Sequence, residues 1–304
     1  MQILVTSRRL LKRGFTLIEI MVATTIMVIL VGLVIQITSE VLSVWNRSSG
    51  RLSANAQARI AMELITQDLE SAVFRKNGMQ WLRAEDETIN GPAGSTVATV
   101  SLKLFSPALD REEGPGELCG IAYKLEYANP IDGSLGAGTT DNRLFILYRL
   151  VVSPESTFED LLGEPNQLEL PGSEAIAWGT NPPNDIIGDE GGNYLVSNIV
   201  EFEIDFYVEE DEVSGDTLAP SPVIYGGTDS TIGSDAVNAF QERYRKPLSY
   251  AVIRLTVISD EGAQQLQNID RIQGAGSNQD KVEDIITTFG ETFVRRIPFL
   301  SKPL

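Results

Sequence analysis

The sequence predicts an α+β protein in which a long N-terminal helix packs against a mostly antiparallel β-sheet head. Two observations predict this fold class. Mostly apolar residues fill a stretch near the N-terminus and then recur at helical spacing to about residue 77. After Gly78 the pattern changes to alternation of apolar and polar residues in several separate segments. Alternation is typical of strands that bury one face, so we expect the sheet to cover the apolar stripe of the helix.

The first element is a short basic leader, residues 1–14, that contains no acidic residue and ends at Gly14. Its basic residues are Arg8, Arg9, Lys12 and Arg13. Basic residues before an apolar span favour retention of that side in the cytoplasm. We therefore expect the N-terminus in the cytoplasm and the chain after the span to be translocated.

The second element, residues 15–37, is predicted to be a transmembrane helix. At 1.5 Å per residue the apolar run is about 34 Å long, enough to cross a hydrocarbon core of about 30 Å. An ordinary secretory signal, or a plain signal anchor, is the alternative. The apolar region of a secretory signal is shorter, roughly 7–15 residues, and its cleavage site follows that region. Here the Gly14–Phe15 junction precedes the apolar run.

One carboxylate, Glu19, lies inside this span. An acidic residue near the centre of a membrane helix costs about 2.5–3.5 kcal/mol on insertion scales. Such a residue usually has a partner and a function, and a neighbouring subunit that offers a cation could set subunit register.

The segment Arg13-Gly14-Phe15-Thr16-Leu17-Ile18-Glu19 resembles the prepilin signature shared by type IV pilins and type II secretion pseudopilins. The resemblance implies that a membrane peptidase cuts after Gly14 and methylates the new amine of Phe15. It also implies that Glu19 pairs with the amine of a neighbouring subunit. The implied partners are the prepilin peptidase/methyltransferase, other pilins or pseudopilins, the inner membrane and an assembly platform.

The function implied is that of a minor, non-enzymatic filament subunit of a type II secretion-like system, with a periplasmic head. The long helix, the strand-rich head and Ser259–Gly262 after an apolar strand loosely resemble the J-type minor pseudopilin. Large pseudopilin-like proteins are a related resemblance. Two alternatives stay open: a minor type IV pilin in adhesion, twitching or DNA uptake, and a non-assembling membrane-anchored binding domain.

Residues 38–77 are predicted to continue the helix as an amphipathic segment. The apolar stripe expected to face the head comprises Ile60, Leu64, Ile65, Leu69, Ala72 and Val73. The polar positions between them are Gln57, Arg59, Glu63, Gln67, Asp68 and Glu70. Gly32 and the stretch Asn46–Gly50 are the positions where a kink or local unwinding is expected.

Residues 78–304 form the predicted β-rich head. Strands are expected over 99–104, 121–127, 144–152, 201–208, 250–257 and 292–297, and a short helix over 260–272. Long polar loops separate them at 110–117, 129–142, 171–193 and 209–235.

Two acidic clusters in these loops offer oxygen atoms that suit Ca²⁺. They are Asp185, Asp189 and Glu190 in one loop and Glu209, Glu210, Asp211 and Glu212 in another. Neither has EF-hand spacing, and acidic runs in so acidic a chain are usually solvated surface. No metal ligand is therefore assigned, and no other cofactor is expected.

Composition narrows the function further. The formal net charge is −18, which argues against nucleic-acid binding because phosphate contacts need Lys and Arg. The chain contains no histidine, the commonest general base, and no nucleophile elbow or phosphate loop. Catalysis is therefore not expected. The single cysteine, Cys119, excludes an intramolecular disulfide and is expected to be a buried small hydrophobe.

Overall fold

The computed structural model describes residues 15–75, 79–108, 110, 116–131, 133, 135, 142–163, 167–168, 186–187, 192–208, 217–218, 223–225, 248–272 and 278–299. The chain divides into two units, Met1–Ser49 and Gly50–Leu304. Helix α1 (Leu17–Glu70) contributes to both.

The first unit contains the N-terminal part of α1, whose side chains from Phe15 to Trp45 are all exposed. In the second unit, α1 buries one face. The buried positions Ala54, Ala58, Ala61, Met62, Ile65 and Leu69 belong to the hydrophobic core. The helix ends at Glu70, before the predicted end at residue 77. Val73 follows the helix and donates its N–H to the Phe105 carbonyl at 2.8 Å, which fixes the chain to that backbone where it leaves the helix.

The larger sheet of the second unit has six strands in the order β5-β4-β3-β2-β1-β8. All of its pairings are antiparallel. The strands are β1 (Leu82–Asn90), β2 (Thr96–Ser106), β3 (Cys119–Ala128), β4 (Leu144–Val151), β5 (Tyr194–Ser197) and β8 (Val223–Tyr225).

The smaller sheet has four strands in the order β10-β9-β6-β7, again all antiparallel. The strands are β6 (Ile199–Val208), β7 (Thr217–Leu218), β9 (Leu248–Ile258) and β10 (Gly290–Pro298). Asn198 connects the two sheets, since it lies between β5 and β6 with a positive φ of 63°. Its N–H donates to Phe145 of the larger sheet at 2.7 Å, and its carbonyl accepts from Ile258 of the smaller one at 2.9 Å.

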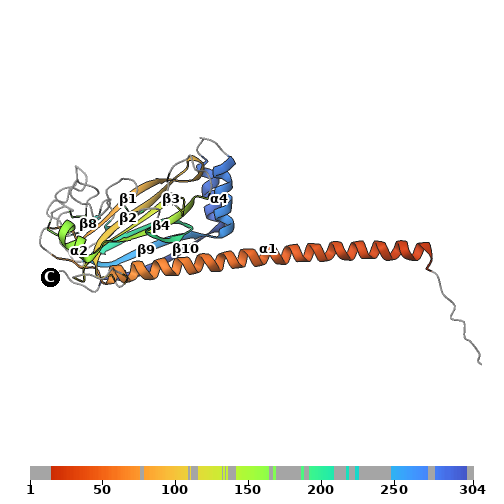
Figure 1. Cartoon of the computed structure of the whole chain (residues 1–304), viewed down its shortest axis with the longest axis horizontal. Coiled ribbons are helices and arrows are strands. Elements are labelled where there is room, and N and C mark those ends of the chain that lie inside the picture. The colour runs from red at the N-terminus through yellow and green to blue at the C-terminus, as the bar shows by residue number, and fades with distance from the viewer. Residues whose placement is uncertain are drawn as a thin grey trace, which may run out of the picture. The chain divides into compact units, whose positions relative to one another are not determined.

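The remaining helices are short. They are η1 (Pro92–Gly94), α2 (Pro154–Ser156), η2 (Thr157–Leu161), α4 (Asp260–Ile272) and α5 (Gln279–Phe289). Helices α4 and α5 form an excursion between the paired strands β9 and β10 (Figure 1). Asp270 of α4 accepts a hydrogen bond from the N–H of Ala93 at 2.8 Å, which ties this excursion to the β1–β2 turn.

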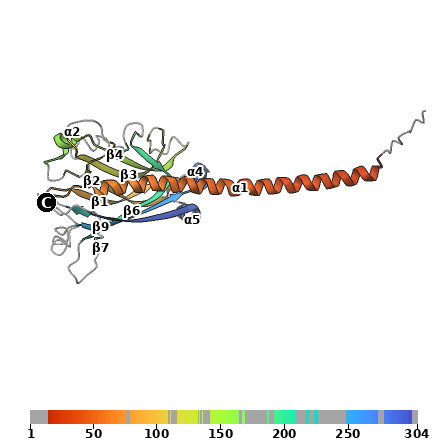
Figure 2. The ribbon, with the colours of Figure 1, turned by 90° about the horizontal axis from the view of Figure 1, so that it is seen from below.

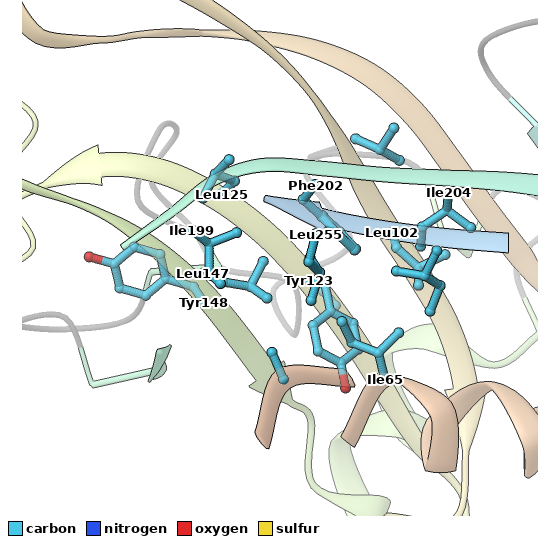
Figure 3. Close-up of a cluster of buried hydrophobic side chains, with 14 of the residues drawn as sticks. Ile65, Leu102, Tyr123, Leu125, Leu147, Tyr148, Ile199, Phe202, Ile204 and Leu255 are labelled. Atoms are coloured by element: carbon cyan, nitrogen blue, oxygen red, sulfur yellow. The ribbon is translucent and has the colours of Figure 1, made fainter. Parts of the chain in front are cut away.

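The core of the second unit lies between the sheets and the buried face of α1. Figure 2 shows the Gly50–Glu70 part of α1 running along the strands of both sheets. In Figure 3 the labelled side chains converge from three sources: Ile65 on α1, Leu102 and Tyr123 on the larger sheet, and Phe202 and Leu255 on the smaller sheet. All five are fully buried. The predicted α+β architecture is therefore confirmed.

The predicted strands all correspond to observed ones, each lengthened or shortened by a few residues, and the helix predicted over 260–272 is α4. Cys119 is buried, as expected. The sequence analysis missed β1, β5, β7 and β8, and it missed α5.

Candidate functional site

The N-terminal end of α1 carries a reciprocal capping arrangement. Thr16 precedes the first helical residue, and its hydroxyl oxygen accepts a hydrogen bond from the N–H of Glu19 at 3.3 Å. In return, the N–H of Thr16 donates to the Oε2 atom of Glu19 at 3.4 Å. A Thr followed three residues later by a Glu is the capping-box signature, which satisfies N–H groups that the first helical turn leaves unpaired.

The capping box gives Glu19 a role within its own helix that the sequence analysis missed. The Thr16-x-x-Glu19 spacing was present in the sequence and could have predicted it. A carboxylate in the first helical turn also interacts favourably with the helix dipole. Both effects orient the Glu19 carboxylate toward the N-terminal end of α1, close to the residue that the prepilin resemblance makes the mature N-terminus.

The surface around Glu19 is apolar and exposed. Phe15 is 81% exposed, Leu17 77% and Ile18 70%, and the exposed apolar residues continue to Trp45. Soluble monomers rarely expose apolar surface so extensively, so this segment needs lipid or other protein around it. By length and composition α1 could cross a membrane. The predicted leader residues Arg8, Arg9, Lys12, Arg13 and Gly14 lie outside the described residues.

A second polar cluster lies at the other end of α1, where the helix meets the larger sheet. Asp68 on α1 is buried, with 1% of its side chain exposed. Its Oδ2 atom accepts a hydrogen bond from the hydroxyl of Tyr123 on β3 and another from Nε of Arg149 on β4 at 2.9 Å. Arg149 also donates to Asp110 at 2.6 Å. We call these four residues, Asp68, Asp110, Tyr123 and Arg149, the helix anchor.

The pKa values within the helix anchor follow from burial and charge. Burial, followed by the negative charge of Asp68, raises the pKa of Tyr123 well above its ordinary value, so the phenol stays neutral. Burial alone lowers the pKa of Arg149, but its hydrogen bonds to Asp68 and Asp110 and the neighbouring Tyr123 raise it overall. The helix anchor is therefore a charged arginine shared by two carboxylates, and only Asp110 reaches solvent, with 54% of its side chain exposed.

The helix anchor corrects one prediction. The sequence analysis placed Asp68 among the polar positions that separate the buried stripe, but the structure buries it. Two residues predicted to belong to the stripe do not: Leu64 is only partly buried, and Ile60 is 52% exposed. The sequence offered no direct signal for the partners of Asp68, because Tyr123 and Arg149 come from strands far along the chain. Their side chains share a face through the β3–β4 register, in which Tyr123 lies opposite Arg149.

Nothing in the described residues forms a cluster of three or more carboxylate, histidine or cysteine side chains able to hold a metal ion. The two acidic loop clusters considered for Ca²⁺, at 185–190 and 209–212, lie outside the described residues, so a bound Ca²⁺ stays an untested prediction.

Comparison with protein families gives one match. Residues 9–35 match the family described as the prokaryotic N-terminal methylation motif. This range contains the predicted cleavage junction, Gly14–Phe15, and Glu19. No curated protein and no solved structure matches the chain. The finer resemblance to the J-type minor pseudopilin therefore stays a prediction.

Proposed function

We propose that this chain, which carries the type IV pilin and pseudopilin signature, is a minor filament subunit that works by assembly. The observation that carries the proposal is the combination of the methylation motif with an apolar helical segment, Phe15–Trp45, that is exposed throughout and has Glu19 near its N-terminal end. In this proposal a prepilin peptidase cuts after Gly14 and methylates Phe15. The basic leader then lies in the cytoplasm and the head in the periplasm, with α1 anchored in the inner membrane.

Glu19 suits an intersubunit contact for a physical reason. In the single chain the hydrogen bonds that the Glu19 carboxylate accepts from Thr16 are long, at 3.4 and 3.5 Å, and are made in an exposed setting. In an apolar filament interior a carboxylate that lacks a cation is strongly penalised. The methylated amine of Phe15 in a neighbouring subunit supplies that cation. This pairing selects the register in which one helix packs against the next.

The helix anchor suits the same function. A subunit drawn from the membrane by its helix must transmit that force to its head. Asp68, Tyr123 and Arg149 join the last two turns of α1 to two central strands through buried, charge-assisted hydrogen bonds. A second contact lies close by, where Ser71 and Ser106 hydroxyls are 2.6 Å apart.

We assign the subunit to a type II secretion-like system. A large, strand-rich unit from Gly50 to Leu304 suits a minor subunit that contacts partners. Deletion separates this assignment from the alternative of a minor type IV pilin. Loss of exoprotein secretion with surface pili intact supports secretion, whereas loss of pili or attachment with secretion intact supports the alternative.

The assembly role is tested by exchanging two glutamates of α1 separately. Glu19→Gln removes the charge proposed to pair with the neighbouring amine. Glu40→Gln is the matched control, because Glu40 is also an exposed carboxylate on α1, and its side chain accepts a hydrogen bond from Gln36 at 3.3 Å. We expect the Glu19→Gln protein to accumulate in the membrane but to disappear from sheared filaments, while Glu40→Gln is incorporated normally. Equal incorporation of both would rule out the assembly role of Glu19, whereas absence of the unchanged protein from filaments would favour a non-assembling anchored domain.

A further inference from the structure

Strand β10 lies at one end of the four-stranded sheet. It pairs with β9 along its whole length, from Gly290–Ile258 to Pro298–Tyr250, without a register shift. Within the part of the chain that the structure describes, no strand pairs with its other side. An edge of this kind presents unpaired N–H and C=O groups and is a template for another strand.

The register identifies which backbone groups face outward. The N–H of Phe299 donates to Ser249, and the N–H of Ser259 donates to Phe289. These bonds bracket the β9–β10 ladder, and hydrogen-bonded pairs alternate along antiparallel strands. The odd-numbered residues of β10 therefore bond to β9, and the N–H and C=O groups of Thr292, Val294 and Arg296 point away from it. All three residues are exposed. Pro298, which has no N–H, falls in the same outward set, as an edge proline should.

A polar groove runs along this edge, between β10 and the Gly50–Glu70 part of α1. Arg51 and Ala54 of α1 line a hollow of about 220 Å³ together with Gly290 and Glu291 of β10. Glu63, Gln67 and Glu70 line a second hollow, of about 360 Å³, with Arg295. The helix and the strand therefore run in the same direction on the two sides of the groove (Figure 1). An extended peptide laid between a sheet edge and a helix is a recurring mode of recognition.

We propose that the edge of β10 binds an extended segment of a different protein by strand addition, with basic side chains toward α1 and β-branched side chains on the opposite face. The basic preference follows from Glu63 and Glu70, which face the groove against the single Arg295. The ion pair across this hollow, Glu63–Arg295 at 3.4 Å, is exposed and is readily exchanged. The β-branched preference follows from Val294, which is 62% exposed on the other face of the strand.

A second copy of β10 fits this edge poorly. Parallel pairing in register would place Glu291, Arg295 and Arg296 beside identical charges, which is destabilising. Antiparallel pairing about a two-fold axis would make the two Gly50–Glu70 helices run in opposite directions. Copies anchored in one membrane with one orientation have these helices in the same direction, a step that rests on the proposed function. The occupant is therefore a segment of another chain.

The test uses the full-length chain in detergent micelles and a fluorescent octapeptide of alternating valine and lysine, at an ionic strength that screens weak surface attraction. Val294→Pro removes one outward N–H and places a ring against the added strand, while leaving the bonds to β9 intact. Val294→Thr is the matched control, because it keeps the N–H and a β-branched side chain. We expect Val294→Pro to weaken peptide binding by about tenfold or more, and Val294→Thr to change it by less than about twofold.

Hydrogen exchange on the wild-type chain gives a second readout that does not depend on the folding of a variant. Saturating peptide should protect the amides of Thr292, Val294 and Arg296. Protection elsewhere, equal binding by the two Val294 variants, or no binding at millimolar peptide would overturn the proposal. An octapeptide of alternating proline and lysine should not bind, because it carries the same charge but cannot form a strand. Peptide binding in micelles requires neither processing nor assembly, so its failure is separable from failure of the proposed function.

Discussion

Asp68 shows how one side chain on the long helix decides where the head is attached. A buried carboxylate is stable only with partners, and here the partners are a buried tyrosine and a buried arginine. Because Arg149 also binds Asp110, the guanidinium has one inner and one outer carboxylate. The last turns of α1 are therefore held by directional bonds, in addition to the apolar contacts of Ile65 and Leu69.

Removing Asp68 should be strongly destabilising. Asp68→Ala leaves Tyr123 and part of the Arg149 guanidinium buried without their acceptor, and breaking a buried ion pair costs about 3–5 kcal/mol. We expect a loss near the lower end of that range, about 3 kcal/mol, because Asp110 still binds Arg149. The measurement is the free energy of unfolding in denaturant, followed by tryptophan fluorescence.

The matched control is Glu63→Gln, because Glu63 also lies on α1 and also faces an arginine, Arg295. That pair is exposed, so its loss should change the free energy of unfolding by less than about 1 kcal/mol. Similar effects of the two substitutions would show that the helix anchor does not hold α1.

At the scale of elements, α1 packs closely against the head because small residues lie on the buried face of the helix. Gly50, Ala54, Ala58 and Ala61 are all buried. A Cβ atom added at Gly50 would lie 3.6 Å from the Cβ of Ser259, an ordinary van der Waals contact. Helix α4 is different, because a Cβ atom added at Gly262 would lie only 2.7 Å from the Cβ of Phe289 in α5.

The same substitution should therefore have opposite effects at two helical glycines. Gly50→Ala should stabilise the protein by about 0.5–1 kcal/mol, because alanine has the higher helix propensity and the site has room. Gly262→Ala should destabilise it by about 1–3 kcal/mol, because the backbones of α4 and α5 must separate. Midpoints of denaturant unfolding compared with the unchanged protein measure both, and a shift of the same sign at both glycines would contradict this packing.

Periodicity predicted the elements whose burial follows one simple rule. Burial alternates along much of β6 and β9, and the pattern of α4 is amphipathic, so both kinds were found. Strand β3 was found from its alternating sequence, although all of its residues are buried. Strand β1 was missed because its centre, Glu85-Asp86-Glu87, is acidic on both faces, a composition more typical of a loop than of a strand. It is a strand because β2 pairs with it over its whole length. Helix α5 was missed, since no element was predicted between 272 and 292, although Val282, Ile285 and Ile286 have helical spacing.

At the scale of the whole molecule, the two ends of α1 differ in what a sequence can reveal. The N-terminal site is local: Gly14, Phe15 and Glu19 lie within six consecutive residues, and the matching family covers them. The helix anchor joins Asp68 to Arg149, which lies 81 residues further along the chain. Only the pairing of β3 with β4 brings Arg149 beside Tyr123, so no local pattern could identify it.

The most direct test of the account is the mass of the N-terminus of the protein isolated from its native membranes. Processing by a prepilin peptidase and methyltransferase predicts a chain that begins at Phe15 and carries one methyl group on its amine. A chain that still begins at Met1, or one cut beyond Ile37, would contradict the account, because neither places a methylated amine four residues before Glu19 at the end of an apolar helix.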